Sequence, residues 1–430
     1  MASENQASTG GIRSNPWVQL IAGIVCMAMV ANLQYGWTVF VDPINAKYHW
    51  SKVAIQYTFT LFVLLETWLV PIEAFLADKY GPRILVASGA LLIALSWVAM
   101  SRADTLTWLY TAGAIGGIGT GLVYGTCVGN AVKWFRNNRG LAAGLTAAGF
   151  GAGAAITVLP LTRSLAEHGY QQTLFNFALF QGGVVLVASL FLAKPAGGAA
   201  ARRSNQPAAE DAPPLKMLSR PIFWLMYVAF TLAGSSGLMA TAQLAPIANS
   251  FGIAKQSVSL LGFTGPALVF ALSLNNLMNG LGRPLFGYIS DWLGREVTLC
   301  ATFLAGGVSM LALSRYGRDP VLFVICAAAI YVFWGDIYSI FPALTSDEFG
   351  TKYATTNYGI LYTGKGWAAF FAPIAGVIAA RSGSWSLVLE IAAAANVVAA
   401  LLMVFGVRAL RRQVSGANLN VPAAASATFE

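Results

Sequence analysis

The chain has 430 residues, of which 57% are hydrophobic and only 10% are charged, whereas about a quarter of the residues of soluble domains are charged. A soluble protein of this length would fold as two or three domains, and 17 acidic and 26 basic residues cannot cover their surfaces. The composition therefore predicts a polytopic membrane protein in a lipid bilayer. The net charge of +9 does not indicate nucleic-acid binding, because the bases fall in short polar connections rather than in a continuous stripe.

Twelve stretches reach the roughly 20 apolar residues that a membrane helix needs. In chain order they are residues 17–41, 52–76, 83–101, 106–133, 139–166, 171–193, 220–248, 258–289, 296–315, 319–345, 354–380 and 384–407. The polar run 194–219, rich in Pro, Ala and charge, divides them into two sets of six. We therefore predict an all-α integral membrane protein, a monomer with six-helix bundles at 17–193 and 220–412 joined by a cytoplasmic linker.

The ends of the chain and the orientation follow from the polar residues. The start, "MASENQASTGGIRSNP", lacks the charged, apolar and small-residue order of a signal peptide. Bases in the connections on the side of the N-terminus outnumber those on the opposite side. We therefore expect both termini in the cytoplasm, with tails at 1–16 and 413–430, and the protein in the cytoplasmic (inner) membrane.

No metal, cofactor or catalytic constellation is indicated. All four cysteines lie inside apolar runs without metal-ligand or redox spacing, and both histidines fall near segment ends. Glu73 and Glu390 also lie near predicted segment ends, where we expect them to be solvated or at headgroup level. We expect neither a metal site nor a cofactor nor an enzymatic activity.

A polar motif occurs once in each half. "AFLADKYGPR" (74–83) follows the second stretch and "GYISDWLGR" (287–295) follows the eighth. Each places an aspartate three residues before a glycine that a base soon follows, which suits a tight turn with a capping or ion-pairing acid. The recurrence indicates two parallel repeats and resembles the major facilitator superfamily. The residues expected to stabilise one gate are Asp78, Arg83, Asp291 and Arg295.

Two bases lie inside predicted helices. Arg283 stands eight residues before Asp291 and Lys365 thirteen after Lys352, about 12 and 19 Å from the cytoplasmic turns. A charge at that depth costs at least about 2.5–3.5 kcal/mol on insertion scales, so it must face a cavity or a partner. One alternative is that an acid of similar depth, Glu66 or Asp336, neutralises each base. We favour a ligand role, for which a small carboxylate suits the guanidinium fork and the mobile ammonium.

Aromatic and polar residues accompany the two bases. As a set at mid-depth they predict a narrow chamber whose hydroxyl and amide groups donate to carboxylate oxygens. Its expected members are Gln34, Tyr35, Gln56, Tyr124, Trp334, Tyr338 and Tyr362.

The stretches "NLQYGWT", "NGLGRPLFG…SDWLGR", "WGDIYSIFPALTSDEFG" and "NYGILYTGKG" resemble the oxalate:formate antiporter family. That resemblance implies exchange of small carboxylates by alternating access, with Arg283 and Lys365 holding the carboxylates inside the aromatic set above. The chain departs from the family in having Tyr362 in place of a tryptophan and Phe150 in place of a tyrosine.

Two acids suggest an alternative transport mode. If Glu66 and Asp336 both face the chamber and are ionised, they cancel the two bases, and the site suits a monocarboxylate that travels with a proton. A proton-coupled monocarboxylate symporter using Glu66 or Asp336 is therefore the alternative. A membrane sensor of the same fold is less favoured, because the short tails offer no signalling domain.

Overall fold

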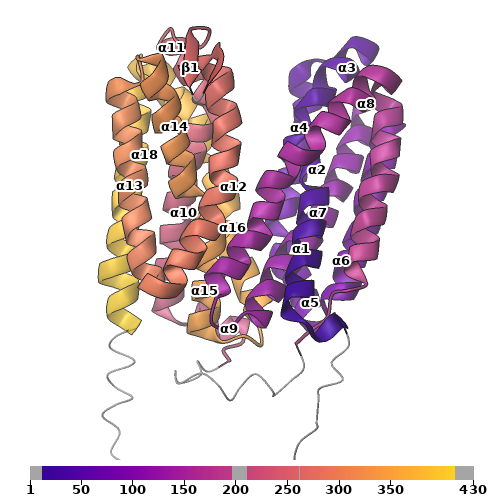
Figure 1. Ribbon diagram of the computed structural model, residues 1–430, viewed down its shortest axis with the longest axis vertical. Helices are drawn as coiled ribbons and strands as arrows, with labels where there is room; N and C mark the ends of the chain where they lie inside the picture. The colour runs from indigo at the N-terminus through magenta and orange to yellow at the C-terminus, as the bar shows by residue number, and fades with distance from the viewer. Residues whose placement is uncertain (1–11, 196–210, 261, 412–430) are drawn as a thin grey trace, which may run out of the picture.

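The computed structural model describes residues 12–195, 211–260 and 262–411, and it shows two helical bundles side by side (Figure 1). The first bundle contains η1 (Ile12–Ser14), α1 (Pro16–Val30), α2 (Asn32–Tyr35), α3 (Thr38–Tyr48), α4 (Lys52–Trp68), α5 (Val70–Tyr80), α6 (Pro82–Ser101), α7 (Leu106–Trp134) and α8 (Arg139–Ser189). The predicted tails lie largely, and the middle of the predicted linker wholly, outside the described residues.

The second bundle follows the linker. It contains α9 (Pro214–Leu218), α10 (Pro221–Ala242), α11 (Leu244–Ser250), β1 (Ser257–Leu260), β2 (Phe263–Pro266), α12 (Ala267–Leu293), α13 (Arg295–Tyr316), α14 (Pro320–Trp334), α15 (Ile337–Phe349), α16 (Ala354–Ala369), α17 (Phe371–Ser382), α18 (Trp385–Leu401) and η2 (Leu402–Val407). We call the end of the molecule at α9 the linker end and the opposite end, at β1 and β2, the hairpin end (Figure 1).

These elements form the predicted twelve transmembrane helices in two six-helix bundles. Among the described residues, eight helical segments are individually long and apolar enough to cross a membrane, and α4 with α5, bent by 48° at their break, makes a ninth. The remaining segments include α12, which carries three asparagines as well as Arg283, and α16, which is only 16 residues long. Large apolar side chains such as Trp224, Leu272 and Phe405 are exposed on the outside, as a lipid-facing surface requires.

Local sequence explains where several helices begin. Asn15 accepts a hydrogen bond from the Trp17 N–H just before α1, and Asp319 accepts from two N–H groups at the start of α14. Pro16 and Pro320 stand at the first helical position, where no N–H is needed. Side-chain caps therefore start helices at both ends of the bundles.

The predicted eighth helix was wrong at its start. Two antiparallel strands, Ser257–Leu260 and Phe263–Pro266, pair with Ser257 opposite Pro266, and α12 begins only at Ala267. Gly262 has φ 81°, a turn conformation that glycine adopts without steric cost. Gly262 and Pro266 interrupt this apolar stretch, so the helix starts only after the proline.

Several membrane helices break at mid-depth, next to predicted site residues. The first segment breaks near Gly36, the second at Leu69 just before Pro71, and the tenth at Gly335. A proline lacks the N–H that would continue the helical hydrogen bonding. Because the helix axis changes direction at each break, side chains before and after it can both point toward the interface between the bundles.

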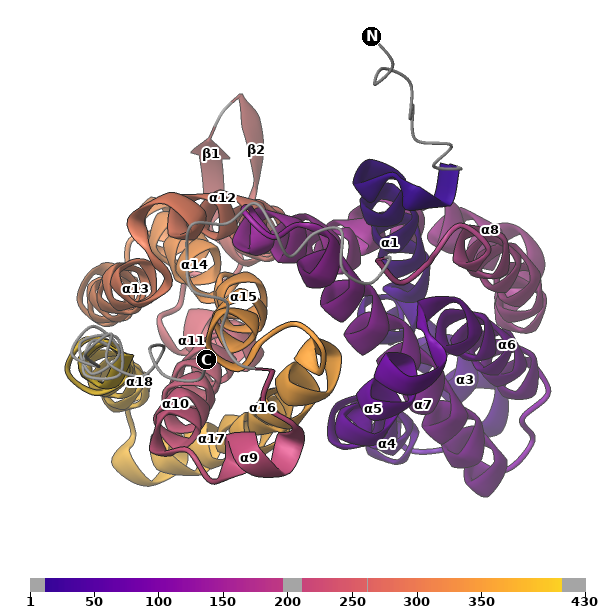
Figure 2. The same ribbon diagram turned by 90° about the horizontal axis from the view of Figure 1, so that it is seen from below.

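The bundles meet mainly along two helix pairs, α8 with α12 and α5 with α16, and α15 also packs against α8 (Figure 2). A side-chain carbon on Gly140 would collide with the Gly287 carbonyl oxygen, and one on Gly359 would lie 3.0 Å from the Val70 carbonyl oxygen. Glycine therefore permits close backbone contact along both pairs.

Candidate substrate-binding site

Arg283 lies on α12 at the interface between the bundles, and its side chain is almost fully buried. Its Nε donates to Asn279 Oδ1 at 3.0 Å, and one terminal nitrogen donates to the Ala147 carbonyl oxygen of α8 at 2.8 Å. The guanidinium carbon lies 5.0 Å from the centre of the Tyr338 ring. Among the described residues no carboxylate lies within ion-pair distance of Arg283, so its charge has only neutral partners.

Lys365 on α16 does have an acidic partner. Its Nζ lies 3.3 Å from one carboxylate oxygen of Glu66 and 3.4 Å from the other, and it donates to the Tyr362 hydroxyl at 2.8 Å. Glu66 is fully buried on α4, so this ion pair joins the two bundles. The alternative that an acid neutralises each base therefore holds for Lys365, which pairs with Glu66, but not for Arg283.

The two bases share one aromatic neighbour. Lys365 Nζ lies 6.0 Å from the centre of the Tyr338 ring that also faces Arg283. With Glu66 ionised, the side chains of Arg283, Lys365 and Glu66 together carry one net positive charge. The two bases beside Tyr338 therefore exceed the one acid that contacts them by one positive charge.

The predicted aromatic residues form a continuous set of ring contacts. Tyr35 and Tyr124 both pack edge-on against Phe150, with ring centres 5.5 and 5.3 Å apart. Tyr124 stacks on Tyr362 at 5.2 Å. The set continues from Tyr362 to Tyr338 and from Tyr338 to Trp334. Phe150, noted only as a departure from the family, links the two rings of the first bundle.

The two glutamines differ in their contacts. Gln34 lies at the helix break beside Tyr35, and its buried Oε1 has no hydrogen-bond partner among the described residues. Gln56 Oε1 accepts from the Trp37 indole N–H at 3.2 Å. Of these two glutamines, Gln34 is the one whose buried side-chain oxygen has no hydrogen-bond partner among the described residues.

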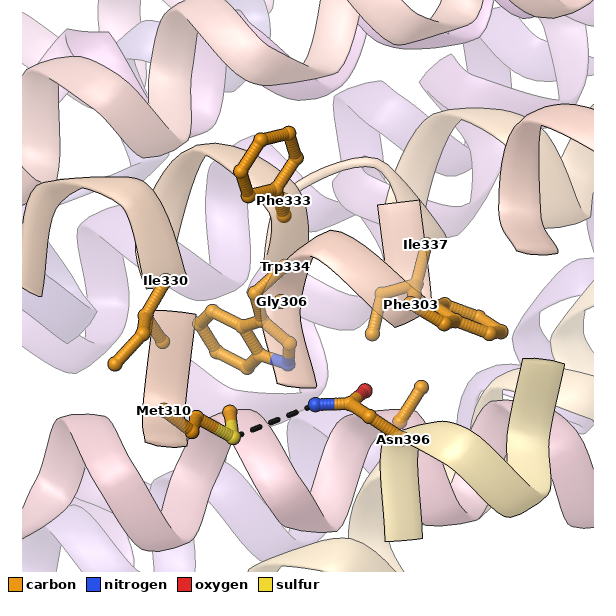
Figure 3. Close-up of a pocket in the computed structure, with 9 residues that line it drawn as sticks. Phe303, Gly306, Met310, Ile330, Phe333, Trp334, Ile337 and Asn396 are labelled. Atoms are coloured by element: carbon orange, nitrogen blue, oxygen red, sulfur yellow. Dashed lines mark hydrogen bonds between the residues drawn. The ribbon is translucent and has the colours of Figure 1, made fainter. Parts of the chain in front are cut away.

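Asp336 is fully buried but contacts neither base. It accepts a hydrogen bond from the Thr302 hydroxyl of α13, and its other oxygen has no partner among the described residues. Its neighbours Trp334 and Ile337 line a cavity of about 10 Å³, in which Asn396 donates to Met310 Sδ at 3.4 Å (Figure 3). That volume is about one water molecule. The condition that both acids cancel both bases is therefore not met in this structure.

Glu73 differs from expectation. It is 5% exposed, and both of its carboxylate oxygens are buried without a hydrogen-bond partner among the described residues. The expectation that Glu73 is solvated was wrong, because the second membrane segment continues to Tyr80 rather than ending near residue 76.

Polar contacts join the bundles at the linker end. Asp78 forms an ion pair with Lys133 and accepts from the Thr356 N–H at 2.9 Å and from its hydroxyl at 2.6 Å. Asp291 accepts from the Gly140 and Leu141 N–H groups, both at 2.9 Å, at the start of α8. A carboxylate is favoured there by the helix dipole.

Asp347, which sequence reasoning missed, completes this network. It forms ion pairs with Arg139 of the first bundle and, at 2.9 Å, with Arg295 of the second. The sequence feature that could have indicated this role is the position of Asp347 in "TSDEFG", an acidic stretch at the end of the tenth segment. Arg83 is the second residue of α6, and its buried Nε has no hydrogen-bond partner among the described residues.

Lys194 extends the network beyond the membrane segments. It donates to the carbonyl oxygens of Asp78 and Lys79 at 2.6 and 3.0 Å, where α5 ends. Burial, together with the nearby charge of Lys133, lowers the pKa of Lys194 below its ordinary value.

Two helical bundles that enclose buried bases at mid-membrane define a transporter rather than an enzyme. The family model of the Major Facilitator Superfamily matches residues 20–373 and 234–427. The oxalate:formate antiporter of Oxalobacter formigenes is 30% identical over 417 residues, which cover 95% of this chain and 96% of the relative. The chain belongs to the Major Facilitator Superfamily, in the family of the oxalate:formate antiporter.

Other comparisons agree on the fold. Monocarboxylate transporter 13 of Bos taurus is 25% identical over 375 residues, 85% of this chain and 81% of the relative. The solved structure of the superfamily transporter FucP in the outward conformation superposes with a TM-score of 0.68 at 15% identity, covering 92% of this chain and 99% of FucP. The chain is therefore a multi-pass membrane transporter.

Proposed function

We propose that this transporter exchanges small carboxylates, oxalate for formate, across the cytoplasmic membrane, and that Arg283 and Lys365 bind them. One observation carries the proposal: Arg283 is buried at mid-membrane without an acidic partner among the described residues. An uncompensated buried charge is costly, so a bound anion would supply what the protein lacks.

The free donors of Arg283 suit a carboxylate. A guanidinium has five N–H donors, and the two hydrogen bonds to Asn279 and Ala147 occupy two of them. The remaining fork can hold two carboxylate oxygens in parallel. Oxalate would place its second carboxylate toward Lys365 by displacing Glu66, whereas formate needs only Arg283.

The contacts at the linker end support alternating access. The ion pair of Asp347 with Arg139 and the hydrogen bonds of Asp78 and Asp291 hold the bundles together there. We propose that the linker end is cytoplasmic, with both termini, and that this arrangement is closed to the cytoplasm. Breaking these contacts while the bundles rock about α8–α12 and α5–α16 would open the site to the cytoplasm.

A second candidate, proton-coupled symport of a monocarboxylate, is favoured by the ion pair of Glu66 with Lys365. An anion that binds Lys365 leaves Glu66 buried without its cation, and taking up a proton removes the cost of that charge. One anion and one proton would then cross together.

The test is uptake of radiolabelled oxalate into proteoliposomes loaded with oxalate, formate or buffer alone. Exchange predicts uptake only into the loaded vesicles and its loss in Lys365→Gln, with the exposed Lys255→Gln as the matched control. Symport predicts instead that an imposed pH gradient drives uptake of formate or lactate into unloaded vesicles. Absence of uptake for all these carboxylates would refute both candidates.

A further inference from the structure

The Glu73 carboxyl group occupies a buried niche in the first bundle. It lies against the backbone of Gly121 on α7, where a side-chain carbon would collide with Glu73 Oε2 and would lie 3.1 Å from the Glu66 carbonyl oxygen. Only a glycine leaves room for the carboxyl group at this place. At this contact between α5 and α7, the packed Glu73 carboxyl group has no hydrogen-bond partner among the described residues.

Among the described residues, no cation forms an ion pair with Glu73. The ionisable side chains on the elements packed against this part of α5 are Glu66 on α4, Arg83 on α6, Tyr124, Cys127 and Lys133 on α7, and Tyr358, Tyr362 and Lys365 on α16. Lys133 pairs with Asp78, Lys365 pairs with Glu66, and among the described residues Arg83 forms no ion pair with Glu73. Because an ionised carboxylate without donors is very costly in an apolar interior, a carboxyl group in this niche is stable as the neutral acid.

Glu73 also lies between two groups of the proposed cycle. It follows Glu66 by seven residues, across the break at Leu69, and precedes Asp78 on α5 by five residues, about 7 Å. Glu66 contacts the substrate-binding lysine, and Asp78 belongs to the contacts that close the linker end. The structure therefore holds a neutral acid between the binding site and the closed end.

We propose that Glu73 is a proton-binding site through which the proton taken up at Glu66 leaves to the cytoplasm. This inference rests on the symport candidate of the proposed function. In the described state Glu73 is protonated and Glu66 is ionised. An anion arriving at Lys365 frees Glu66, which takes a proton from the outside.

The inward half of the cycle returns both acids to their starting states. Opening of the linker end admits water to Glu73, which releases its proton to the cytoplasm and becomes a carboxylate. As the anion leaves, the proton of Glu66 passes through that water to Glu73, and Glu66 pairs again with Lys365. One proton and one anion have then crossed, and no other reactant is consumed.

The transport test compares wild type, Glu73→Gln and the exposed control Glu390→Gln in proteoliposomes. Glutamine has the shape of the neutral acid but carries no transferable proton. We expect Glu73→Gln to lose at least tenfold of the accumulation of formate or lactate driven by a pH gradient, while exchange at equal pH stays within about twofold of wild type. Accumulation equal to that of wild type would overturn the proposal.

A second measurement needs no transported substrate. Infrared spectroscopy of the purified protein should show the C=O stretching band of a protonated, non-hydrogen-bonded carboxyl group that persists at neutral pH, disappears in Glu73→Gln and remains in Glu390→Gln. Should Glu73→Gln fail to fold, Gly121→Ala, which fills the niche, should shift that band. A spectrum without a band sensitive to either variant would overturn the inference, whereas absent wild-type transport with the band present would refute only the proposed function.

Discussion

Replacing Glu66 by glutamine removes the negative charge from the site and leaves its shape nearly unchanged. In the described structure, Glu66 lies 3.3 Å from Lys365 Nζ. Two unit charges at that distance attract each other by about 5 kcal/mol at an effective dielectric constant of about 20. A dicarboxylate that uses Lys365 must overcome much of this attraction, whereas a monocarboxylate on Arg283 need not.

The variant should therefore favour oxalate over formate. A second carboxylate about 5 Å from Lys365 gains about 3 kcal/mol at the same dielectric constant, and about half of this after solvation corresponds to about a tenfold gain in affinity. We expect the KM for oxalate to fall about tenfold in Glu66→Gln and that for formate to change by less than about twofold. The ligand-free variant should also be less stable, because Lys365 is then buried without its acid.

The assay measures initial rates of oxalate and formate exchange in proteoliposomes, with thermal unfolding of the purified protein in parallel. Glu390→Gln, which removes an exposed acid, is the control for the loss of one negative charge. An oxalate KM that stays unchanged, or that changes in the same proportion as the formate KM, would refute the reasoning. The reasoning would also be refuted if oxalate raised the thermal unfolding temperature of the wild type and of Glu66→Gln by the same amount.

Three further substitutions test other parts of the site. Arg283→Lys loses the guanidinium hydrogen bonds, each worth about 1.5–3 kcal/mol, so oxalate exchange should fall about a hundredfold, and near-normal exchange would show that the fork is not needed. Asp347→Asn breaks the ion pair with Arg139. In a chain whose own cysteines are replaced by serine, it should raise labelling of a Thr355→Cys reporter by a membrane-impermeant thiol reagent several-fold. Unchanged labelling would exclude a role of Asp347 in closing the linker end. Asp336→Asn should leave the oxalate-to-formate KM ratio within about twofold, and a larger change, measured in the same exchange assay, would place its charge in the site.

Much of the architecture follows from composition and spacing. Runs of apolar residues with few charges can only be accommodated in lipid, and the repeated motifs at Asp78 and Asp291 mark where the second and eighth segments end. The distance from Asp291 also predicts the depth of Arg283. The hairpin before Ala267 was not predicted, because a short apolar run is compatible with either helix or strand.

The partners of the buried charges depend on tertiary packing. Nothing in the sequence shows that Lys365 meets Glu66 on a helix of the other bundle while Asp336 turns toward Thr302. Glu73 was misplaced for a simpler reason. Hydropathy ends the second segment where polar residues begin, but the helix continues to Tyr80 and buries Glu73 against α7.

The most direct test of the central claim is exchange of radiolabelled oxalate in proteoliposomes loaded with formate, for wild type and for Arg283→Gln. If Arg283 binds the carboxylate, uptake by the wild type requires internal carboxylate and disappears in the variant, which lacks the one buried base without an acidic partner among the described residues. Uptake by Arg283→Gln equal to that of the wild type would contradict it.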